Sequence, residues 1–282
     1  MAGGRPAGPG PQTMKSEQTK ISALLNLLED EDSQVSTLAM EQLLLLERGA
    51  DDLLKEFQEA ANPRLRGRIH QLGSILKIRR SRNAFIHEAL NSTLSLWAGL
   101  LHINYQYNPR LNFESVDGML NELAARLPAK LTTVRLCAFL RDENFQYTQE
   151  DTLGSDLFLV EDVLVQRVGS PILLSVIAHC LGEKAGWHSS PVLYHGRHCL
   201  IDDSHGNLIE PADGWKITRY SRDDRLHPCG DRDIWLTVLC QLFLAAMLEG
   251  RLQAIHRVGA ILARLCGAGT GSLPYPLGGQ VS

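Results

Sequence analysis

The sequence predicts an α+β protein that is mostly helical, with an N-terminal lobe of α-helical repeats, a central domain containing a small antiparallel sheet, and a C-terminal helix pair. Three observations support this prediction. Apolar residues recur every three or four positions over residues 17–82 and again over 231–266, which is the period of amphipathic helices. Between these segments, residues 192–211 contain short strand-like runs separated by turn residues.

The bulk composition indicates a globular protein with reduced cysteines. Of the 282 residues, 44% are hydrophobic, which is enough to fill a core. The formal net charge of -4 gives no strong field that would favour nucleic acid or an anionic membrane. No pair among the six dispersed cysteines has CxxC spacing, so we expect reduced thiols in a cytoplasmic protein. We also expect no cofactor.

Both ends of the sequence are predicted to be disordered tails. Residues 1–16 are rich in glycine and proline and lack the apolar run of a signal peptide or membrane anchor. Residues 267–282 contain only isolated core formers. We therefore expect a soluble protein with no membrane partner.

Residues 17–82 form a predicted helical lobe. Aligning Val35 with Leu65 gives an offset typical of helix-pair repeats, and Leu53 and Leu54 begin the second copy. These two units resemble HEAT-type repeats. The alternative interpretation is a run of four unrelated amphipathic helices, interrupted at Asn62-Pro63.

A basic stretch without carboxylates runs from Arg64 to Arg82. It suits an acidic partner or RNA, but solvated helix faces are often basic and no aromatic residues or reading motif accompany the charge. We therefore expect an unidentified protein partner rather than nucleic acid, with Arg79, Arg80 and Arg82 as its binding residues.

Several further helices follow in the sequence. The patterns predict helices at 84–102, at 114–127 with Ser115 or Asn112 as the cap, and over "TVRLCAFLRDENF". In "VGSPILLSVIAHCLGEKAG", Ser170 is the predicted N-cap, Pro171 occupies the first helical position and Gly186 ends the helix. Cys180 falls on the apolar face of that helix, whereas Ser175 and His179 form a predicted surface pair with no chemistry assigned.

The stretch "YHGRHCLIDDSHGNLIEPADGW" contains three histidines, a cysteine and four carboxylates around predicted strands. A three-residue turn, Asp203 to His205, would place His198 directly opposite Glu210, and a four-residue turn would move that pairing by one position. A histidine and an acid on neighbouring strands, facing a helix N-terminus, is the arrangement in which an acid orients an imidazole and the imidazole activates a thiol.

These segments together resemble a known family. The run "GSPILLSVIAHCLGEKAGW...HGRHCLI...LIEPADGW" is similar to the transglutaminase-like domain of the SirB type, with its Gly-x-Pro-Ile helix opening, Gly-His turn and acid-Pro strand end. "NFESVDGMLNELAARL" resembles the family's helical lead-in, and Ile234 to Leu265 resembles its tetratricopeptide-like segment. The resemblance spans about residues 90–266 and implies a papain-like domain over 83–230 followed by the helix pair.

The resemblance also implies which residues take the family's site positions. His198 matches the histidine, although the inserted residue in Gly196-Arg197-His198 lets His195 compete for that position. Glu210 matches the acid, and Ser170-Pro171 stands where an active relative has cysteine. The resemblance thus implies a fold kept without acyl-transfer chemistry, acting in protein interaction or regulation.

Two alternatives stay open from the sequence. One is a weak hydrolase or acyl-transferase in which His198 and Glu210 serve Ser170 or Cys199 as nucleophile, although Cys199 is expected on the opposite strand face from His198. The other is a metal-binding hairpin. Its ligands would be His195, His198 and His205 with one of Asp202, Asp203 or Glu210. We expect no bound metal, and favour a structural role for the His198–Glu210 pair.

Overall fold

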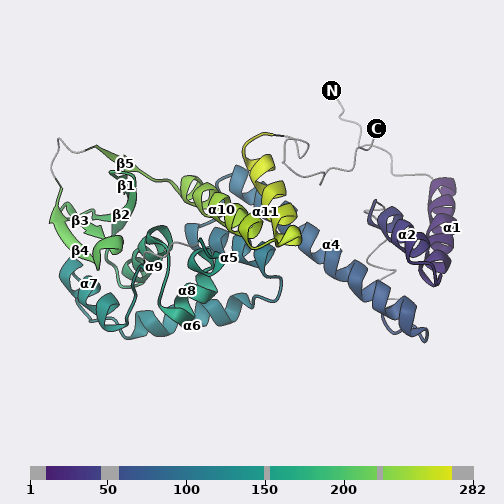
Figure 1. The fold of residues 1–282 in the computed structure, drawn as a ribbon, viewed down its shortest axis with the longest axis horizontal. Coiled ribbons are helices and arrows are strands. Elements are labelled where there is room, and N and C mark those ends of the chain that lie inside the picture. The colour runs from purple at the N-terminus through teal and green to yellow at the C-terminus, as the bar shows by residue number, and fades with distance from the viewer. Residues whose placement is uncertain (1–10, 46–56, 149–152, 221–224, 269–282) are drawn as a thin grey trace, which may run out of the picture. The chain divides into compact units, whose positions relative to one another are not determined.

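The computed structural model describes residues 11–45, 57–148, 153–220 and 225–268 (Figure 1). The chain divides into two compact units, Met1–Ser81 and Arg82–Ser282, and the division falls inside a helix rather than in a linker. Within the described ranges, no helix has both the length and the apolar character needed to cross a membrane.

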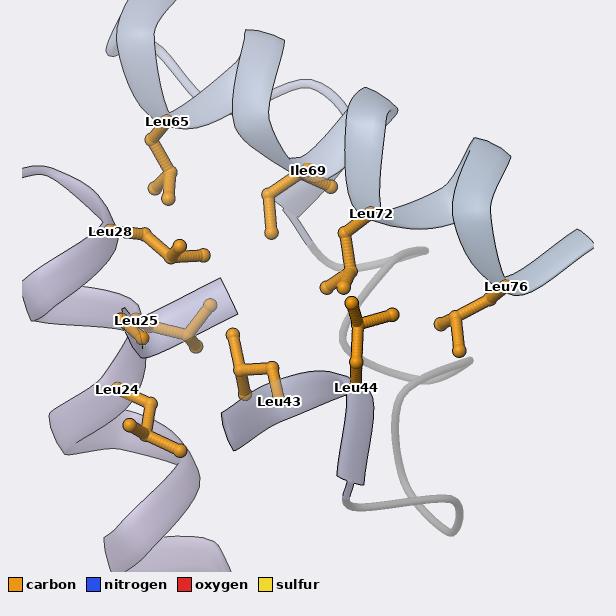
Figure 2. Close-up of a cluster of buried hydrophobic side chains, with 10 residues drawn as sticks. Leu24, Leu25, Leu28, Leu43, Leu44, Leu65, Ile69, Leu72 and Leu76 are labelled. Carbon is orange, nitrogen blue, oxygen red and sulfur yellow. The ribbon is translucent and has the colours of Figure 1, made fainter. Parts of the chain in front are cut away.

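The first unit contains helices packed through leucine side chains. Its described helices are α1 (Pro11–Leu28), α2 (Ser33–Leu45) and the N-terminal part of α4 (Pro63–Leu90). Figure 2 shows side chains from all three helices pointing toward one another. The cluster comprises Leu24, Leu25, Leu28, Ala39, Leu43, Leu44, Leu65, Ile69, Leu72 and Leu76. Each fully buried leucine contributes about 1.5–3 kcal/mol of transfer free energy, so this cluster holds the unit together.

The helix boundaries in this part of the chain differ from those predicted. Helix α1 begins at Pro11, inside the stretch expected to be a tail. Helix α4 continues to Leu90 because no proline or glycine interrupts it after Gly73 and because Phe85 and Ile86 extend its buried side. The predicted helix at 84–102 is therefore split by a break between Leu90 and Leu96. Leu53 and Leu54 of the second predicted repeat lie outside the described residues.

The second unit is predominantly helical. Its helices are α5 (Leu96–Tyr107), α6 (Phe113–Ala125), α7 (Thr133–Asp142), α8 (Val160–Gln166), α9 (Pro171–Lys184), α10 (Asp231–Leu248) and α11 (Leu252–Leu265), with 3-10 turns η1 (Ser155–Phe158) and η2 (Pro211–Asp213). Asn112 rather than Ser115 caps α6, since its side chain accepts the amide of Glu114 at 3.0 Å.

One five-stranded antiparallel sheet is present in the described part of this unit. The strands are β1 (Ser189–Tyr194), β2 (Arg197–Asp202), β3 (Asn207–Glu210), β4 (Lys216–Arg219) and β5 (Leu226–Pro228), in the order β4-β3-β2-β1-β5. The turn between β1 and β2 consists of His195 and Gly196, both with positive φ, as in a type I′ hairpin turn. The small sheet beside many helices confirms the predicted α+β class (Figure 1).

The C-terminal helices pack against α5. The Trp235 indole N–H donates to the carbonyl of Leu96 at 3.0 Å. A Cβ at Gly99 would lie 2.2 Å from the Trp235 ring, so only glycine allows this close approach. The predicted break at Glu249-Gly250 is confirmed, and Glu249 accepts hydrogen bonds from Tyr107 and Ser155.

Candidate functional site

The start of helix α9 holds Ser170 and Pro171, which the sequence resemblance aligned with the nucleophile position. Ser170 is the N-cap: its hydroxyl oxygen accepts the amide of Leu173 at 3.5 Å, and its own N–H donates to the carbonyl of Leu157 at 2.9 Å. Pro171 occupies the first turn, as predicted. With only 3% of Ser170 exposed, this hydroxyl is buried and engaged in capping.

Helix α9 packs against β1 and β2 (Figure 1). The register of these two strands shows which residues lie opposite each other. His198 pairs with Leu193, whereas Cys199 pairs with Val192. Because successive side chains on a strand point to opposite faces, His198 and Cys199 are directed away from each other. This confirms the face assignment made from the sequence.

His198 is half-buried and lacks a polar partner. Among the described residues, its imidazole makes no hydrogen bond or ion pair, and burial alone lowers its pKa from the ordinary value of 6.5. The imidazole is therefore neutral at physiological pH. A neutral imidazole can accept a proton, but here no acid orients it.

Glu210 is not brought opposite His198. The turn between β2 and β3 contains four residues, Asp203 to Gly206, so Leu200 pairs with Ile209 and Ile201 with Leu208. This register is one position away from the direct His198–Glu210 pairing expected for a three-residue turn. Glu210 instead accepts a hydrogen bond from the Thr218 hydroxyl at 3.3 Å.

Cys199 lies in a small apolar cluster with Val192 and Leu208 and is 1% exposed. Burial raises the pKa of its thiol to about 12, and the nearby charge of Glu210 adds to this shift. Because the thiolate is the reactive form, a thiol with this pKa is a poor nucleophile. Its burial and its strand face both argue against Cys199 as the nucleophile of the enzyme alternative.

The three histidines of the hairpin occupy separate environments. His195 lies in the β1–β2 turn, with its ring 4.2 Å from that of Tyr194, whereas His205 lies in the β2–β3 turn. In the part of the chain that the structure describes, no three histidine, cysteine, aspartate or glutamate side chains gather as metal ligands would. The geometry therefore gives the metal-hairpin alternative no support.

A polar network that the sequence did not reveal lies at the other end of β2. Asp202 is 1% exposed, and its carboxylate accepts the amides of Ser204 at 2.9 Å and His205 at 3.3 Å. The same carboxylate accepts the Thr133 hydroxyl and lies 3.2 Å from Nδ1 of His205. Burial by itself raises the pKa of Asp202, but these hydrogen bonds outweigh it and lower the pKa.

A cavity of about 370 Å³ adjoins this network. Its lining includes Leu131, Thr133, Trp187, His188, His205 and Asn207.

Part of the Asp202 network could have been found from the sequence, because the "DDSHG" letters indicate a turn in which an aspartate accepts local amides. Thr133 precedes Asp202 by 69 residues, so sequence reasoning had no signal for this part of the network.

Ser175 and His179 do not form the predicted surface pair. Ser175 is 2% exposed and its hydroxyl has no hydrogen-bond partner within the described ranges. Nδ1 of His179 lies 3.2 Å from the Ser189 hydroxyl on β1. The prediction was wrong because the sheet covers this side of α9, which makes both faces of the helix buried.

The basic stretch of α4 is partly used within the first unit. Arg64 forms an ion pair with Glu31 at 2.7 Å, and Arg68 donates to the carbonyls of Leu28 and Asp30. Arg79 lies 3.5 Å from the carbonyl oxygen of Leu44, at the end of α2. Cations at helix C-terminal ends stabilise the exposed carbonyls. Of the other proposed binding residues, Arg80 is exposed and Arg82 is half-buried.

The comparisons with known proteins concern the second unit. Residues 113–238 match the model of a family described as the transglutaminase-like superfamily, a range that runs from α6 into α10 and includes α9 and the sheet. Neither a curated protein nor a solved structure matches the chain. Residues 113–238 therefore form a transglutaminase-like superfamily domain.

Proposed function

We propose that the transglutaminase-like domain is non-catalytic and that the chain acts in protein interaction or regulation in the cytoplasm. It would do so through its helical surfaces and a degenerate active-site cleft. The observation that carries this proposal is the start of α9, where the buried Ser170 caps the helix and Pro171 follows it. We further propose that the domain is of the SirB type, on the basis of its Gly-x-Pro-Ile helix opening.

Acyl transfer requires a nucleophile that an adjacent base can activate. Pro171 has no nucleophilic side-chain atom, and the Ser170 hydroxyl oxygen accepts a hydrogen bond from the amide of Leu173. The carboxylate of Glu210 is hydrogen-bonded to Thr218 instead of orienting His198. The roles of His198, Glu210 and Ser170 in this proposal are therefore vestigial, with His198 packed in the domain rather than engaged in catalysis.

Exposed apolar side chains support an interaction role. Leu244, Met247 and Leu248 near the end of α10 and Leu252 at the start of α11 are between 46% and 73% exposed. Clustered exposed apolar residues are typical of protein interaction sites. The tetratricopeptide-like and HEAT-like character of the flanking helices, and binding through Arg79, Arg80 and Arg82, belong to the same proposal.

The proposal is tested by looking for chemistry that depends on His198. The purified chain is incubated with a labelled primary amine and a glutamine-rich acceptor protein, and separately with a fluorophosphonate that reacts with activated serines. We expect equal, background labelling in the wild type and in the His198→Ala variant. A fluorophosphonate adduct on Ser170, or amine transfer that His198→Ala abolishes, would instead establish the hydrolase or acyl-transferase alternative.

A further inference from the structure

The basic side chains of α4 between Arg64 and Arg79 fall into two sets. Those of Arg64, Arg68 and Arg79 are held by carboxylate or carbonyl oxygens of the same unit. In contrast, Arg66, His70 and Lys77 are exposed, and their side chains make no hydrogen bond or ion pair within the described ranges. The second set is therefore available to bind another molecule.

The available set lies along one face of the helix. Arg66 and His70 are four residues apart, and Lys77 follows seven residues after His70, which is about two turns of an α-helix. No carboxylate occurs in α4 before Glu88, so nothing on this helix face neutralises the charge. We call this face the basic stripe, defined by Arg66, His70 and Lys77.

A groove accompanies the stripe. It has a volume of about 290 Å³ and is lined by Gln58, Ile69, His70, Gly73, Ser74 and Lys77. Gly73 and Ser74 bring little side-chain bulk to the groove, and the Ile69 side chain is 1% exposed because it belongs to the buried cluster of the first unit. The groove thus presents hydrogen-bonding groups, together with the cation of Lys77.

We infer that this groove binds an acidic segment of a protein partner. The carboxylates of the segment pair with Lys77 in the groove and with Arg66, which lies on the same helix face. The inference rests on the proposed interaction function and specifies its partner chemistry. Charge complementarity is the argument for this occupant, because a cationic helix face that has no carboxylate of its own before Glu88 favours a carboxylate-bearing peptide over a neutral or basic one.

A peptide fits these observations better than a nucleic acid does. Proteins that bind single-stranded nucleic acid combine cations with aromatic side chains on which bases stack. From Pro63 to Ala84 the helix contains no phenylalanine, tyrosine or tryptophan. The whole chain carries a formal net charge of -4, so it offers no extended positive field to a polyphosphate.

The test is a selection of peptides from a random phage-displayed library on the full-length protein. Selected peptides are synthesised, and their affinities are measured by fluorescence anisotropy at low and high salt. We expect enrichment of peptides that carry several carboxylates. Their binding should weaken at high salt, because screening reduces attraction between exposed charges.

Variants then locate the binding site. Arg66→Glu with Lys77→Glu should weaken binding of the selected acidic peptides by roughly tenfold or more, since two favourable charge contacts become repulsive. Ser74→Trp, which fills the groove without changing its charge, should also weaken binding. The matched control is Arg110→Glu with Lys130→Glu, which reverses two exposed cations of the second unit and should leave binding unchanged. Circular dichroism checks that each variant keeps its helices.

Three results would overturn the inference. These are a selection without acidic enrichment, acidic peptides whose affinity is the same for the groove variants and the control, and RNA oligonucleotides that bind through Arg66 and Lys77 in place of peptides. None of these readouts involves His198 or Ser170. A catalytic second unit would therefore refute the proposed non-catalytic role without affecting this result, and the reverse also holds.

Discussion

The polar side chains at the two ends of strand β2 lie in different environments. At its start, His198 is half-buried and has no polar partner among the described residues. At its end, Asp202 is almost fully buried and is satisfied by backbone amides and the Thr133 hydroxyl. His198, which the resemblance matches to the family's histidine, thus has no polar partner among the described residues. Asp202, predicted only as an alternative metal ligand, instead belongs to a hydrogen-bond network.

This contrast shows that acids and histidines close in sequence need not act together. A buried carboxylate is costly unless its lone pairs are occupied, and the turn after Asp202 supplies the required donors locally. Burial of His198 costs less free energy, because a neutral imidazole is less costly to bury than a charge. We therefore assign Asp202 to stability and expect His198 to tolerate substitution.

The largest expected effect concerns the thiol beside His198. With a pKa of about 12, Cys199 should be alkylated by iodoacetamide about a thousandfold more slowly than a thiol with an ordinary pKa, because each pKa unit reduces the thiolate fraction tenfold. Mass spectrometry of the native protein should show the exposed Cys240 and Cys266 labelled first. Rapid labelling of Cys199 would mean that the start of β2 does hold an activated group.

The second prediction compares stability at the two ends of the strand. Asp202→Ala should lower the free energy of unfolding by about 2–4 kcal/mol, because it leaves the Thr133 hydroxyl and two turn amides without their acceptor. His198→Ala should cost about 1 kcal/mol, the typical loss for a substitution that breaks no polar network. Urea unfolding measures both.

The control for this comparison is Asp203→Ala. Asp203 is exposed and accepts one hydrogen bond, from the Ser190 hydroxyl at 2.9 Å. Its loss should cost less than about 1 kcal/mol. If Asp203→Ala and Asp202→Ala are equally destabilising, burial of the Asp202 network does not explain the loss of unfolding free energy in Asp202→Ala.

The third prediction is a stability change with pH at each end. The pKa of Asp202 is below its ordinary value of 3.8, so the unfolded state takes up a proton first and stability falls as pH drops below 3.8. The pKa of His198 is below 6.5, so protonation again favours the unfolded state, but stability falls as pH drops below 6.5. Asp202→Asn should remove the lower step and His198→Gln the upper one in unfolding free energies measured across pH.

The smallest expected effect is that of His205→Ala. The His205 side chain is 75% exposed, so its contact with Asp202 is screened by solvent and should contribute less than about 1 kcal/mol. The backbone amides of residues 204 and 205 keep their bonds to Asp202 in this variant. A loss similar to that of Asp202→Ala would show that the imidazole, rather than the backbone, satisfies the carboxylate.

Local features of the molecule were predictable from the sequence. The cap and proline at the start of α9 and the Glu249-Gly250 break each depend on residues within a few positions of one another, whereas the sequence left Ser115 and Asn112 as alternative caps of α6. The extent of α4 was harder to predict, because the basic run around residue 80 hides an apolar period that resumes at Phe85.

The register of β2 and β3 was not determined by the sequence. "DDSHGN" is compatible with turns of three or four residues, and a shift of one residue moves every side chain to the other face. Only the structure selects the four-residue turn and so separates Glu210 from His198. The burial of both faces of α9 likewise depends on the sheet that covers it.

The sequence by itself determined the cap and proline of α9, the break at Glu249-Gly250 and the opposite faces of His198 and Cys199, because these follow from backbone sterics and from spacing along a short stretch. The tertiary structure alone decided which polar groups meet. The Thr133 hydroxyl donates a hydrogen bond to Asp202, 69 positions away in the chain. Glu210 accepts a hydrogen bond from Thr218 and makes none with His198. Such contacts depend on how separate elements pack, so no local pattern encodes them.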